Sequence, residues 1–302
     1  MKLNQLRDFL AVAQHGGIRA AARELGLTQP SISKSIQQLE ASLGVPLFDR
    51  TGRKLRLNRF GEAFLARTGG VVNQLRRAED EIKQLRTESA GALSLSMGGV
   101  SLLTLLPGAL LRFRKRFTDA SVRLVERTYE QALADLRSGA IEFAVLPEPP
   151  ELIGSEFATE ILLRDRYVVV GRRGHPLAGV RDLEGLLEAS WIVTRQRGVR
   201  TAEFEQMFKS RGLPVPRVEI HCESLIAVLA LLARTDLLAI LPSRWLRVEP
   251  VGHVAQALPV DDLPNANSIC VLWRAANPLT PAAAAFVAAL TVEANAQGSQ
   301  NR

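Results

Sequence analysis

Residues 18–43 constrain the fold more than any other stretch of the chain. They read IRAAARELGLTQPSISKSIQQLEASL, which predicts two helices joined by a tight turn. Gly26 is placed to take the left-handed conformation that ends the first helix. Thr28 stands at the N-cap of the second helix, and Pro30 follows in its first turn, where a missing N–H costs nothing. The segment therefore predicts a compact helical hairpin.

The second helix has two distinct faces. Its buried stripe is predicted from apolar residues spaced four, three and four apart, namely Ile32, Ile36, Leu39 and Leu43. The other face carries hydrogen-bonding side chains, a single positive charge and no carboxylate, and a helix-turn-helix offers such a face to the DNA major groove. The alternative is an ordinary hairpin with a solvated polar face. The candidate DNA-binding residues here are Thr28, Gln29, Pro30, Ser31, Ser33, Lys34 and Gln37.

The positive charge of the chain is concentrated around this hairpin. The formal net charge is +7, and residues 1–92 hold 15 Lys or Arg against 9 Asp or Glu, a net of +6. The remaining residues hold 23 and 22, a net of +1. A basic module joined to a nearly neutral one indicates a polyanion reader fused to a second function. A merely soluble basic surface would leave the clustering unexplained.

A basic ribbon is predicted after the hairpin, in PLFDRTGRKLRLN at residues 46–58. Short apolar segments flank a turn at Thr51-Gly52, beside which stand Arg50, Arg53 and Lys54. Such a wing can neutralise phosphates or enter a minor groove. The alternative is that these cations are only solvated.

Residues 59–86 predict one long helix with a heptad seam. The seam consists of Phe64, Val71, Leu75, Ala78, Ile82 and Leu85, with Thr68 filling its gap. A lone helix of this length has nothing of its own to bury the seam against, so we expect it to pair with a second copy. The alternative is packing on the C-terminal part of its own chain.

From residue 93 onward, strands alternate with helices, including a helix predicted over residues 102–117. This order is typical of an α/β domain with a mostly parallel sheet. The predicted fold class is thus α+β and multi-domain. We expect a mostly helical winged helix-turn-helix at residues 1–58, a linker and dimerisation helix at 59–88, a hinge at 89–92 and an α/β domain at 93–302.

Composition narrows the class of protein further. The 302 residues are 47% hydrophobic and 23% charged, which suffices for packed cores. Cys222 and Cys270 are the only cysteines and form no CxxC pair, so we expect a reducing compartment. Residues 1–14 predict an amphipathic helix rather than a secretion signal, and no apolar run reaches about 18 residues. We therefore expect a cytoplasmic protein without membrane contact, and not an exported solute-binding protein.

Enzymatic function is disfavoured by the motifs. The sequence contains no HExxH, GxSxG, P-loop or GxGxxG pattern. His221 and Cys222 are neighbours on one predicted strand, so they point to opposite faces and do not readily share a metal. We expect no catalytic residues, no metal site and no cofactor.

The run RAAARELGLTQPSISKSIQQLEASLGVPLFDRTGRKLRLNRFGEAFL resembles the winged helix-turn-helix of LysR-type transcriptional regulators. The resemblance implies a C-terminal effector domain with two lobes, like a periplasmic binding protein. Lobe I would comprise residues about 93–165 and 269–295, and lobe II residues about 166–268. It also implies a dimer or tetramer, an interrupted inverted repeat in double-stranded DNA, and RNA polymerase as a further partner. Lys34 departs from the family's usual Arg and cannot form its bidentate fork to guanine.

In such a domain, a ligand is expected between the lobes, at carboxyl ends of strands and N-termini of helices. The candidate effector-binding residues are Val100, Ser101, Thr128, Leu146, Thr194, Arg195, Arg197, Glu223 and Ser224. The arginines favour an anionic effector, a carboxylate or a sulfonate. Two alternatives stay open: the hydroxyls are plain N-caps, and the arginines are solvated or lie at a subunit contact.

Overall fold

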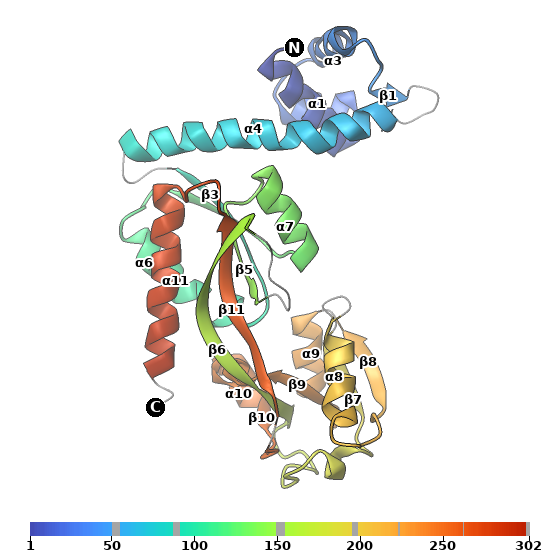
Figure 1. Ribbon diagram of the computed structural model, residues 1–302, viewed down its shortest axis with the longest axis vertical. Helices are drawn as coiled ribbons and strands as arrows, with labels where there is room; N and C mark the ends of the chain where they lie inside the picture. Colours follow the sequence, from blue (N-terminus) through green and yellow to red (C-terminus); the bar gives the residue numbers. More distant parts are fainter. Residues whose placement is uncertain are drawn as a thin grey trace. The chain divides into compact units, whose positions relative to one another are not determined.

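The computed structural model describes residues 1–49, 55–86, 91–148, 155–194, 199–222, 224–261 and 263–299 (Figure 1). The chain forms two units. One comprises residues 1–86 with residues 134–140, and the other comprises residues 87–133 with residues 141–302. Each unit has its own buried core, so each is described by itself.

The N-terminal unit is a three-helix bundle with a short ribbon and a long helix. Its elements are α1 (Leu3–His15), α2 (Ile18–Glu24), α3 (Gln29–Leu43), β1 (Phe48–Asp49), β2 (Arg56–Leu57) and α4 (Arg59–Arg86). Phe9 of α1 is fully buried, with its ring centroid 5.5 Å from that of Phe48 and 5.2 Å from that of Phe64. One aromatic cluster thus joins α1, the ribbon and α4.

The turn of the helical hairpin has the predicted chemistry. Gly26 has φ of 63°, and the Thr28 hydroxyl accepts a hydrogen bond from the backbone N–H of Ser31 at 3.4 Å. Ile32, Ile36 and Leu39 are buried as expected. The prediction for Leu43 is wrong, because its side chain is 36% exposed in the last turn of α3, directly before the left-handed Gly44.

Helix α4 is continuous through Gly69 and Gly70. Asn58 caps it, since the Asn58 side-chain oxygen accepts from the N–H groups of Phe60 at 2.9 Å and Gly61 at 3.0 Å. Four apolar side chains of the predicted seam are exposed within one copy of the chain: Val71 at 53%, Leu75 at 40%, Ile82 at 58% and Leu85 at 66%.

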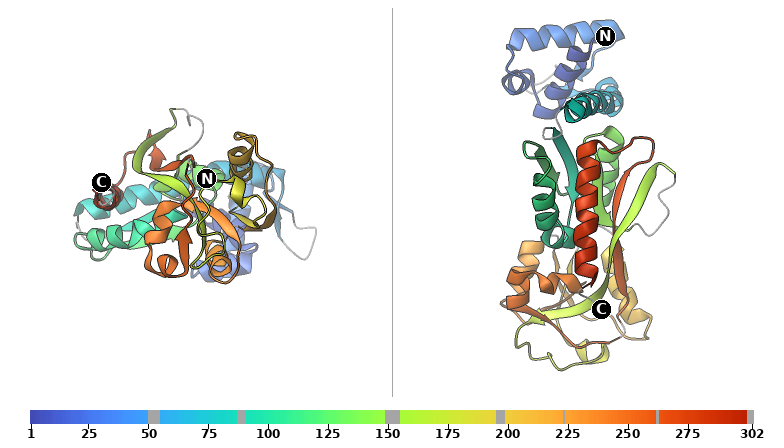
Figure 2. Two further views of the ribbon diagram at one scale, coloured as in Figure 1. Left: turned by 90° about the horizontal axis from the view of Figure 1, so that it is seen from below. Right: turned by 90° about the vertical axis from the view of Figure 1, so that its left-hand side faces the viewer.

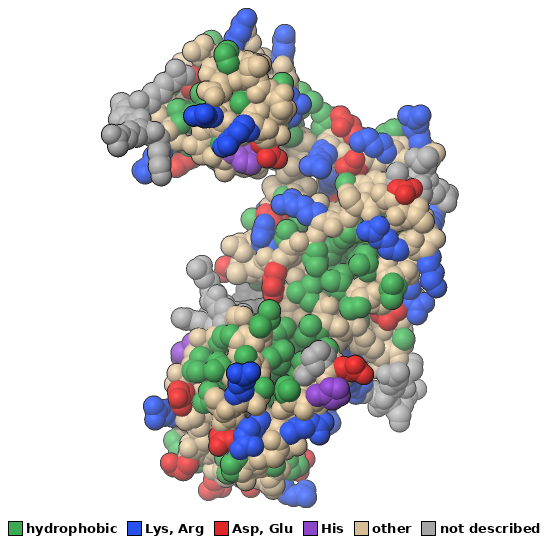
Figure 3. Space-filling model, turned by 180° about the vertical axis from the view of Figure 1, so that it is seen from behind, with side chains coloured by type: hydrophobic (Ala, Val, Ile, Leu, Met, Phe, Trp, Pro, Cys, Tyr) green, Lys and Arg blue, Asp and Glu red, His purple; other side chains and the backbone are tan. Residues whose placement is uncertain are grey.

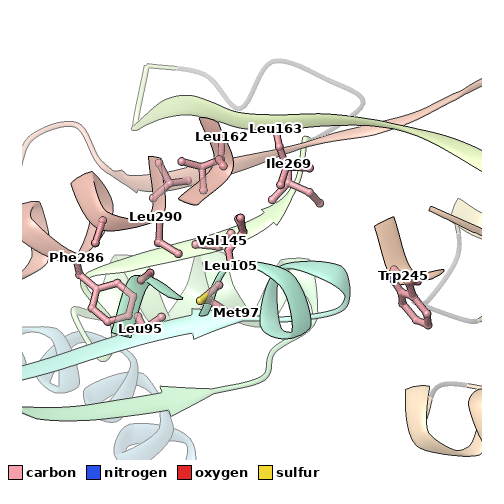
Figure 4. Close-up of a cluster of buried hydrophobic side chains, with 14 of the residues drawn as sticks. Leu95, Met97, Leu105, Val145, Leu162, Leu163, Trp245, Ile269, Phe286 and Leu290 are labelled. Carbon is pink, nitrogen blue, oxygen red and sulfur yellow. The ribbon is translucent and has the colours of Figure 1, made fainter. Parts of the chain in front are cut away.

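The C-terminal unit has two lobes joined by the long strand β6 (Phe157–Arg172). Lobe I contains β3 (Ala92–Met97), α5 (Val100–Thr104), α6 (Leu106–Arg114), β4 (Ser121–Val125), β5 (Phe143–Pro147), β11 (Asn265–Arg274) and α11 (Pro281–Ser299). Helix α7 (Tyr129–Ser138) begins in this lobe, and its residues from 134 onward are grouped with the first unit. Helix α11 runs alongside α6 and β6 (Figure 2). Figure 4 shows their shared core, in which Phe286 and Leu290 of α11 meet Leu95 and Met97 of β3.

Lobe II contains η1 (Glu184–Leu186), β7 (Trp191–Thr194), α8 (Val199–Lys209), β8 (Val218–Cys222), α9 (Leu225–Leu232), β9 (Leu238–Pro242), η2 (Ser243–Arg247), α10 (Glu249–Val254) and β10 (Ala255–Ala257). Trp191 is fully buried, and its ring centroid lies 5.3 Å from that of Phe204. Helix α8 is thereby packed on the sheet of lobe II.

The sheet is mixed, so the expectation of a mostly parallel sheet was incomplete. The strand order is β4-β3-β5-β11-β6-β9-β7-β8, with β10 paired to β6. Four pairs are parallel: β3 with β4 and β5 in lobe I, and β7 with β8 and β9 in lobe II. The pairs that β6 forms with β9, β10 and β11 are antiparallel, as is β11 with β5, because the chain crosses between the lobes in both directions.

The helix predicted over residues 102–117 is two helices. Helix α5 ends at Thr104, and α6 begins at Leu106 with Pro107 in its first turn. Proline donates no hydrogen bond and its ring clashes with the carbonyl four residues before it, so one helix cannot continue through Pro107, whereas the first turn of a new helix accepts it.

Candidate DNA interface and effector cleft

The outward face of α3 is open to a ligand. Gln29, Pro30, Ser31, Lys34 and Gln37 are exposed, as is Thr28 before them, and Ser33 is half-buried. The side chains of Gln29, Lys34 and Gln37 form no hydrogen bond or ion pair with residues that the structure describes. Because the opposite stripe of α3 is buried in the core, this face is held outward, and the side-chain donors and acceptors of these three residues are unused.

A carboxylate that the sequence interpretation missed fixes the ribbon to α3. The side chain of Glu40 accepts hydrogen bonds from the N–H groups of Leu47 at 2.8 Å and Phe48 at 3.3 Å. Glu40 lies in the C-terminal half of α3, where the helix dipole disfavours a negative charge. A negative charge in this unfavourable position is the sequence signal that could have indicated a hydrogen-bonding partner for Glu40.

The ribbon itself forms as predicted, with Phe48 paired to Leu57 and Asp49 to Arg56 in antiparallel register. The predicted basic tip, Arg50, Arg53 and Lys54, lies outside the described residues.

In lobe I, the candidate effector residues have structural hydrogen bonds. Ser101 is fully buried in α5, and its hydroxyl donates to the carbonyl of Gly98 at 2.8 Å. Thr128 and Gln131 cap each other at the start of α7. The Thr128 hydroxyl accepts from the Gln131 N–H at 3.4 Å, and the Gln131 side-chain oxygen accepts from the Thr128 N–H at 3.1 Å. Val100 begins α5, and Leu146 is 4% exposed in β5.

Leu146 also contacts a cysteine. Its carbonyl accepts a hydrogen bond from the Cys270 thiol at 3.5 Å. Burial raises the pKa of Cys270 to about 12, and the negative charge of Glu148 acts in the same direction. This thiol is therefore a protonated structural donor at neutral pH.

In lobe II, the candidates divide into three groups. Ser224 caps α9, where its hydroxyl accepts from the N–H of Ala227 at 3.3 Å. Arg195, Arg197 and Glu223 lie outside the described residues. Thr194 ends β7 and lines a pocket with about 310 Å³ of empty space, part of it open to solvent. Of the candidates that the structure describes, Thr194 is the one that the pocket lining includes.

The pocket also brings together residues that the sequence interpretation missed. Tyr167 comes from β6, Glu203, Phe204 and Met207 come from α8, and Ile240 comes from β9. Glu203 lies nine positions after Thr194, in the first half of α8, and this proximity to a predicted ligand-binding strand end was the available signal.

A buried polar junction lies where β6 crosses between the lobes. Asp165 of β6 accepts hydrogen bonds from the Ser243 hydroxyl at 2.7 Å and the Arg244 N–H at 3.2 Å. The Arg244 side chain, 3% exposed, donates to Gln297 of α11 at 3.3 Å, and Gln297 donates to the Thr104 carbonyl at the end of α5 at 2.6 Å. Burial lowers the pKa of Arg244, while Asp165 opposes that shift. The junction thus ties η2 of lobe II to α5 and α11 of lobe I.

Two sequence families match this chain. Residues 3–62 match the family described as "Bacterial regulatory helix-turn-helix protein, lysR family", and residues 86–294 match the "LysR substrate binding domain". The chain belongs to the LysR family. The predicted fold class is confirmed by these matches together with the observed helical unit, long helix and two-lobed α/β unit.

Curated members of the LysR family align along most of the chain. The regulator GalR of Pseudomonas putida is 27% identical over 287 residues, which cover 95% of this chain and 72% of that protein. The regulator GbpR of Azospirillum brasilense is 26% identical over 294 residues, 96% of this chain and 86% of that protein. Both are named HTH-type transcriptional regulators. The two LysR family matches make the protein described here a DNA-binding transcriptional regulator rather than an enzyme.

Solved LysR structures share the fold. The crystal structure of CbnR has a TM-score of 0.71 at 23% identity, covering 97% of this chain and 99% of that one. Full-length CbnR in complex with its target DNA gives the same TM-score at 25% identity, covering 97% and 100%. The described helices of this LysR protein include none that is long and apolar enough to cross a membrane.

Proposed function

We propose that this LysR regulator reads double-stranded DNA through the exposed face of α3. The observation that carries the proposal is the row of unused donors and acceptors on that face, of which Gln29, Lys34 and Gln37 are the clearest. Gln and Lys side chains recognise base edges and phosphates in the major groove. Arg50, Arg53 and Lys54 of the ribbon tip would grip the backbone or minor groove. The protein would work in the cytoplasm, with its DNA, and contact RNA polymerase there.

The DNA site is proposed to be an interrupted inverted repeat, because two copies would bind it with two-fold symmetry. Exposure of the α4 seam, most marked at Leu85 with 66%, supports pairing of α4 with a second copy. The C-terminal unit also exposes Leu111 at 71% and Ile226 at 80%, and Figure 3 shows apolar side chains gathered on one of its faces. These surfaces support further association into tetramers.

The effector is proposed to be a small carboxylate or sulfonate bound between the lobes of the C-terminal unit. The N-termini of α7 and α9 carry partial positive charge, and Arg195 and Arg197 stand in the sequence between β7 and α8. Binding would change the angle between lobes around the crossing strands, and so change the spacing of the two α3 helices. The free energy by which the effector shifts the equilibrium between the two lobe arrangements equals the difference between its binding free energies for them.

The DNA site can be found by selecting genomic fragments that the full-length protein binds, followed by footprinting. We expect two protected half-sites whose centres are separated by about one or more turns of 10–10.5 base pairs. Arg53→Ala should weaken binding to all fragments and lower the salt dependence by about one unit of slope. A single asymmetric half-site, bound by a monomer, would contradict the symmetric reader.

The effector class can be tested by calorimetric titration with carboxylates, sulfonates and matched neutral analogues. We expect the anions to bind and their neutral amides or sugars to bind more weakly. Preferential binding of neutral sugars would reject an anionic effector, while leaving the DNA-binding proposal intact.

A further inference from the structure

The pocket of lobe II has the composition of a ligand-binding surface. Its walls include the apolar side chains of Phe204, Met207 and Ile240, and its polar members include Tyr167, Thr194 and Glu203. Ligand sites are typically apolar concavities in which a few placed polar groups fix the ligand's orientation. The enclosed part of the pocket is about 20 Å³, room for one small polar group at the end of a ligand, and the rest opens to solvent.

Glu203 is the one charged side chain among the described residues that line this pocket. It is half-buried, and its carboxylate forms no hydrogen bond or ion pair with any residue that the structure describes. Glu205, in the same helix, differs because its carboxylate accepts a hydrogen bond from the Lys209 ammonium group at 2.6 Å. The oxygens of Glu203 are therefore available to a hydrogen-bond donor from outside the protein.

We propose that Glu203 reads a hydrogen-bond donor, a hydroxyl or an ammonium group, on the end of the effector that enters lobe II. The inference rests on the proposed effector-binding function and narrows its ligand class. The anionic group of the effector would lie toward the N-termini of α7 and α9, and the donor would lie in the pocket, with an apolar segment against Phe204 and Met207. The effector is then a hydroxy acid or an amino acid.

The same carboxylate excludes other ligands. A second anionic group in the pocket would be repelled by Glu203, and a methyl ether could not donate to it. Dicarboxylates and capped analogues of otherwise equal size are therefore poor effectors.

The test is calorimetric titration of the full-length protein with two matched sets of probes. The aromatic set is 4-hydroxybenzoate, 4-(aminomethyl)benzoate, 4-methoxybenzoate and terephthalate, and the aliphatic set is 4-hydroxybutanoate, 4-methoxybutanoate and succinate. We expect the donor-bearing member of at least one set to bind about tenfold more tightly than its methoxy and dicarboxylate partners. Equal or tighter binding of the methoxy or dicarboxylate probes, or no binding by any donor-bearing probe at millimolar concentration, overturns the proposal.

Variants test whether Glu203 causes the preference for donor-bearing probes. Glu203→Gln removes the charge at nearly constant shape and should reduce the tenfold preference to about threefold or less, because hydrogen bonds to neutral acceptors are weaker. Glu205→Gln, in the same helix but outside the pocket lining, should keep it, and Glu203→Asp should keep part of it. An undiminished preference in Glu203→Gln contradicts the assignment.

DNA binding is measured on the same preparations without probes. Unchanged affinity for a selected genomic fragment shows that Glu203→Gln is folded. Loss of fragment binding in the unmodified protein would refute the proposed DNA-reading function and not the role of Glu203, so the two failures are distinguishable.

Discussion

Polar side chains are used differently in the two units of the molecule. On α3 of the N-terminal unit, Gln29, Lys34 and Gln37 are exposed and form no side-chain hydrogen bonds with described residues. In the C-terminal unit, Ser101 and Thr128, which occupy equally suggestive positions, bond to backbone groups of their own lobe. A polar residue at a plausible site is thus a better candidate for ligand contact when the fold has not already given it a partner.

The comparison separates two kinds of expected mutational effect. Where polar groups are already satisfied within the fold, their removal should lower stability. Where they are unused, their removal should leave stability unchanged and affect binding.

The largest effect is expected at the buried junction of Arg244. Arg244→Ala removes donors to Gln297 and to the Arg164 carbonyl, and should lower the free energy of unfolding of the C-terminal unit by about 3 kcal/mol. Arg244→Met retains the volume and removes a buried charge, so its cost should be smaller, about 1 kcal/mol. Urea denaturation followed by tryptophan fluorescence measures the free energy of unfolding of both variants. An Arg244→Ala variant as stable as the parent would show that the junction does not stabilise the C-terminal unit.

The N-terminal unit depends instead on close backbone packing where the ribbon meets α4. A Cβ at Gly61 would overlap the Leu47 carbonyl oxygen and the Leu57 side chain, so Gly61→Ala should cost about 2 kcal/mol. Gly69→Ala, in the same helix, meets nothing nearer than Leu10 at 4.0 Å and should gain up to about 1 kcal/mol from helix propensity. Thermal unfolding by circular dichroism compares the pair. Equal melting temperatures would mean that the ribbon is not packed against α4 as observed.

A smaller effect is expected at Thr128, where a predicted ligand residue serves as a helix cap. Thr128→Val keeps the shape and loses the cap, which should destabilise the C-terminal unit by about 1 kcal/mol, whereas Thr128→Ser should be nearly neutral. If Thr128→Val leaves stability unchanged but weakens effector binding, the hydroxyl belongs to the ligand site rather than to the cap.

These differences explain how much the sequence could predict. The hairpin was predictable almost residue by residue because its signals are local: the Gly26 stop, the Thr28 cap and the spacing of Ile32, Ile36 and Leu39 all act within one or two turns. Leu43 was mispredicted because periodicity does not indicate where the packing partner ends. The division into a basic and a neutral unit followed from composition alone.

The effector domain was predictable only in outline. Alternating strands and helices indicated α/β architecture, but the antiparallel crossing of β6 and β11 depends on pairing between residues more than 90 positions apart, such as Phe157 with Arg274. The pocket has the same origin, since Tyr167, Glu203 and Ile240 come together from three elements. Lys209, four residues after Glu205, marks that acid as paired, but only the fold shows that Glu203 lines the pocket.

The most direct test of the account is the effect of Lys34→Ala on DNA affinity, measured by fluorescence anisotropy with the selected operator and variants changed at each base pair. Arg76→Ala is the matched control, because it removes an exposed positive charge from α4 instead of α3. We predict that Lys34→Ala melts like the parent, binds the operator about tenfold more weakly and loses discrimination at one base-pair position, since a good base contact is worth about 1–3 kcal/mol. Arg76→Ala should change affinity about threefold or less and discriminate as the parent does. Full affinity and unchanged discrimination in Lys34→Ala would contradict the claim that the open face of α3 reads DNA.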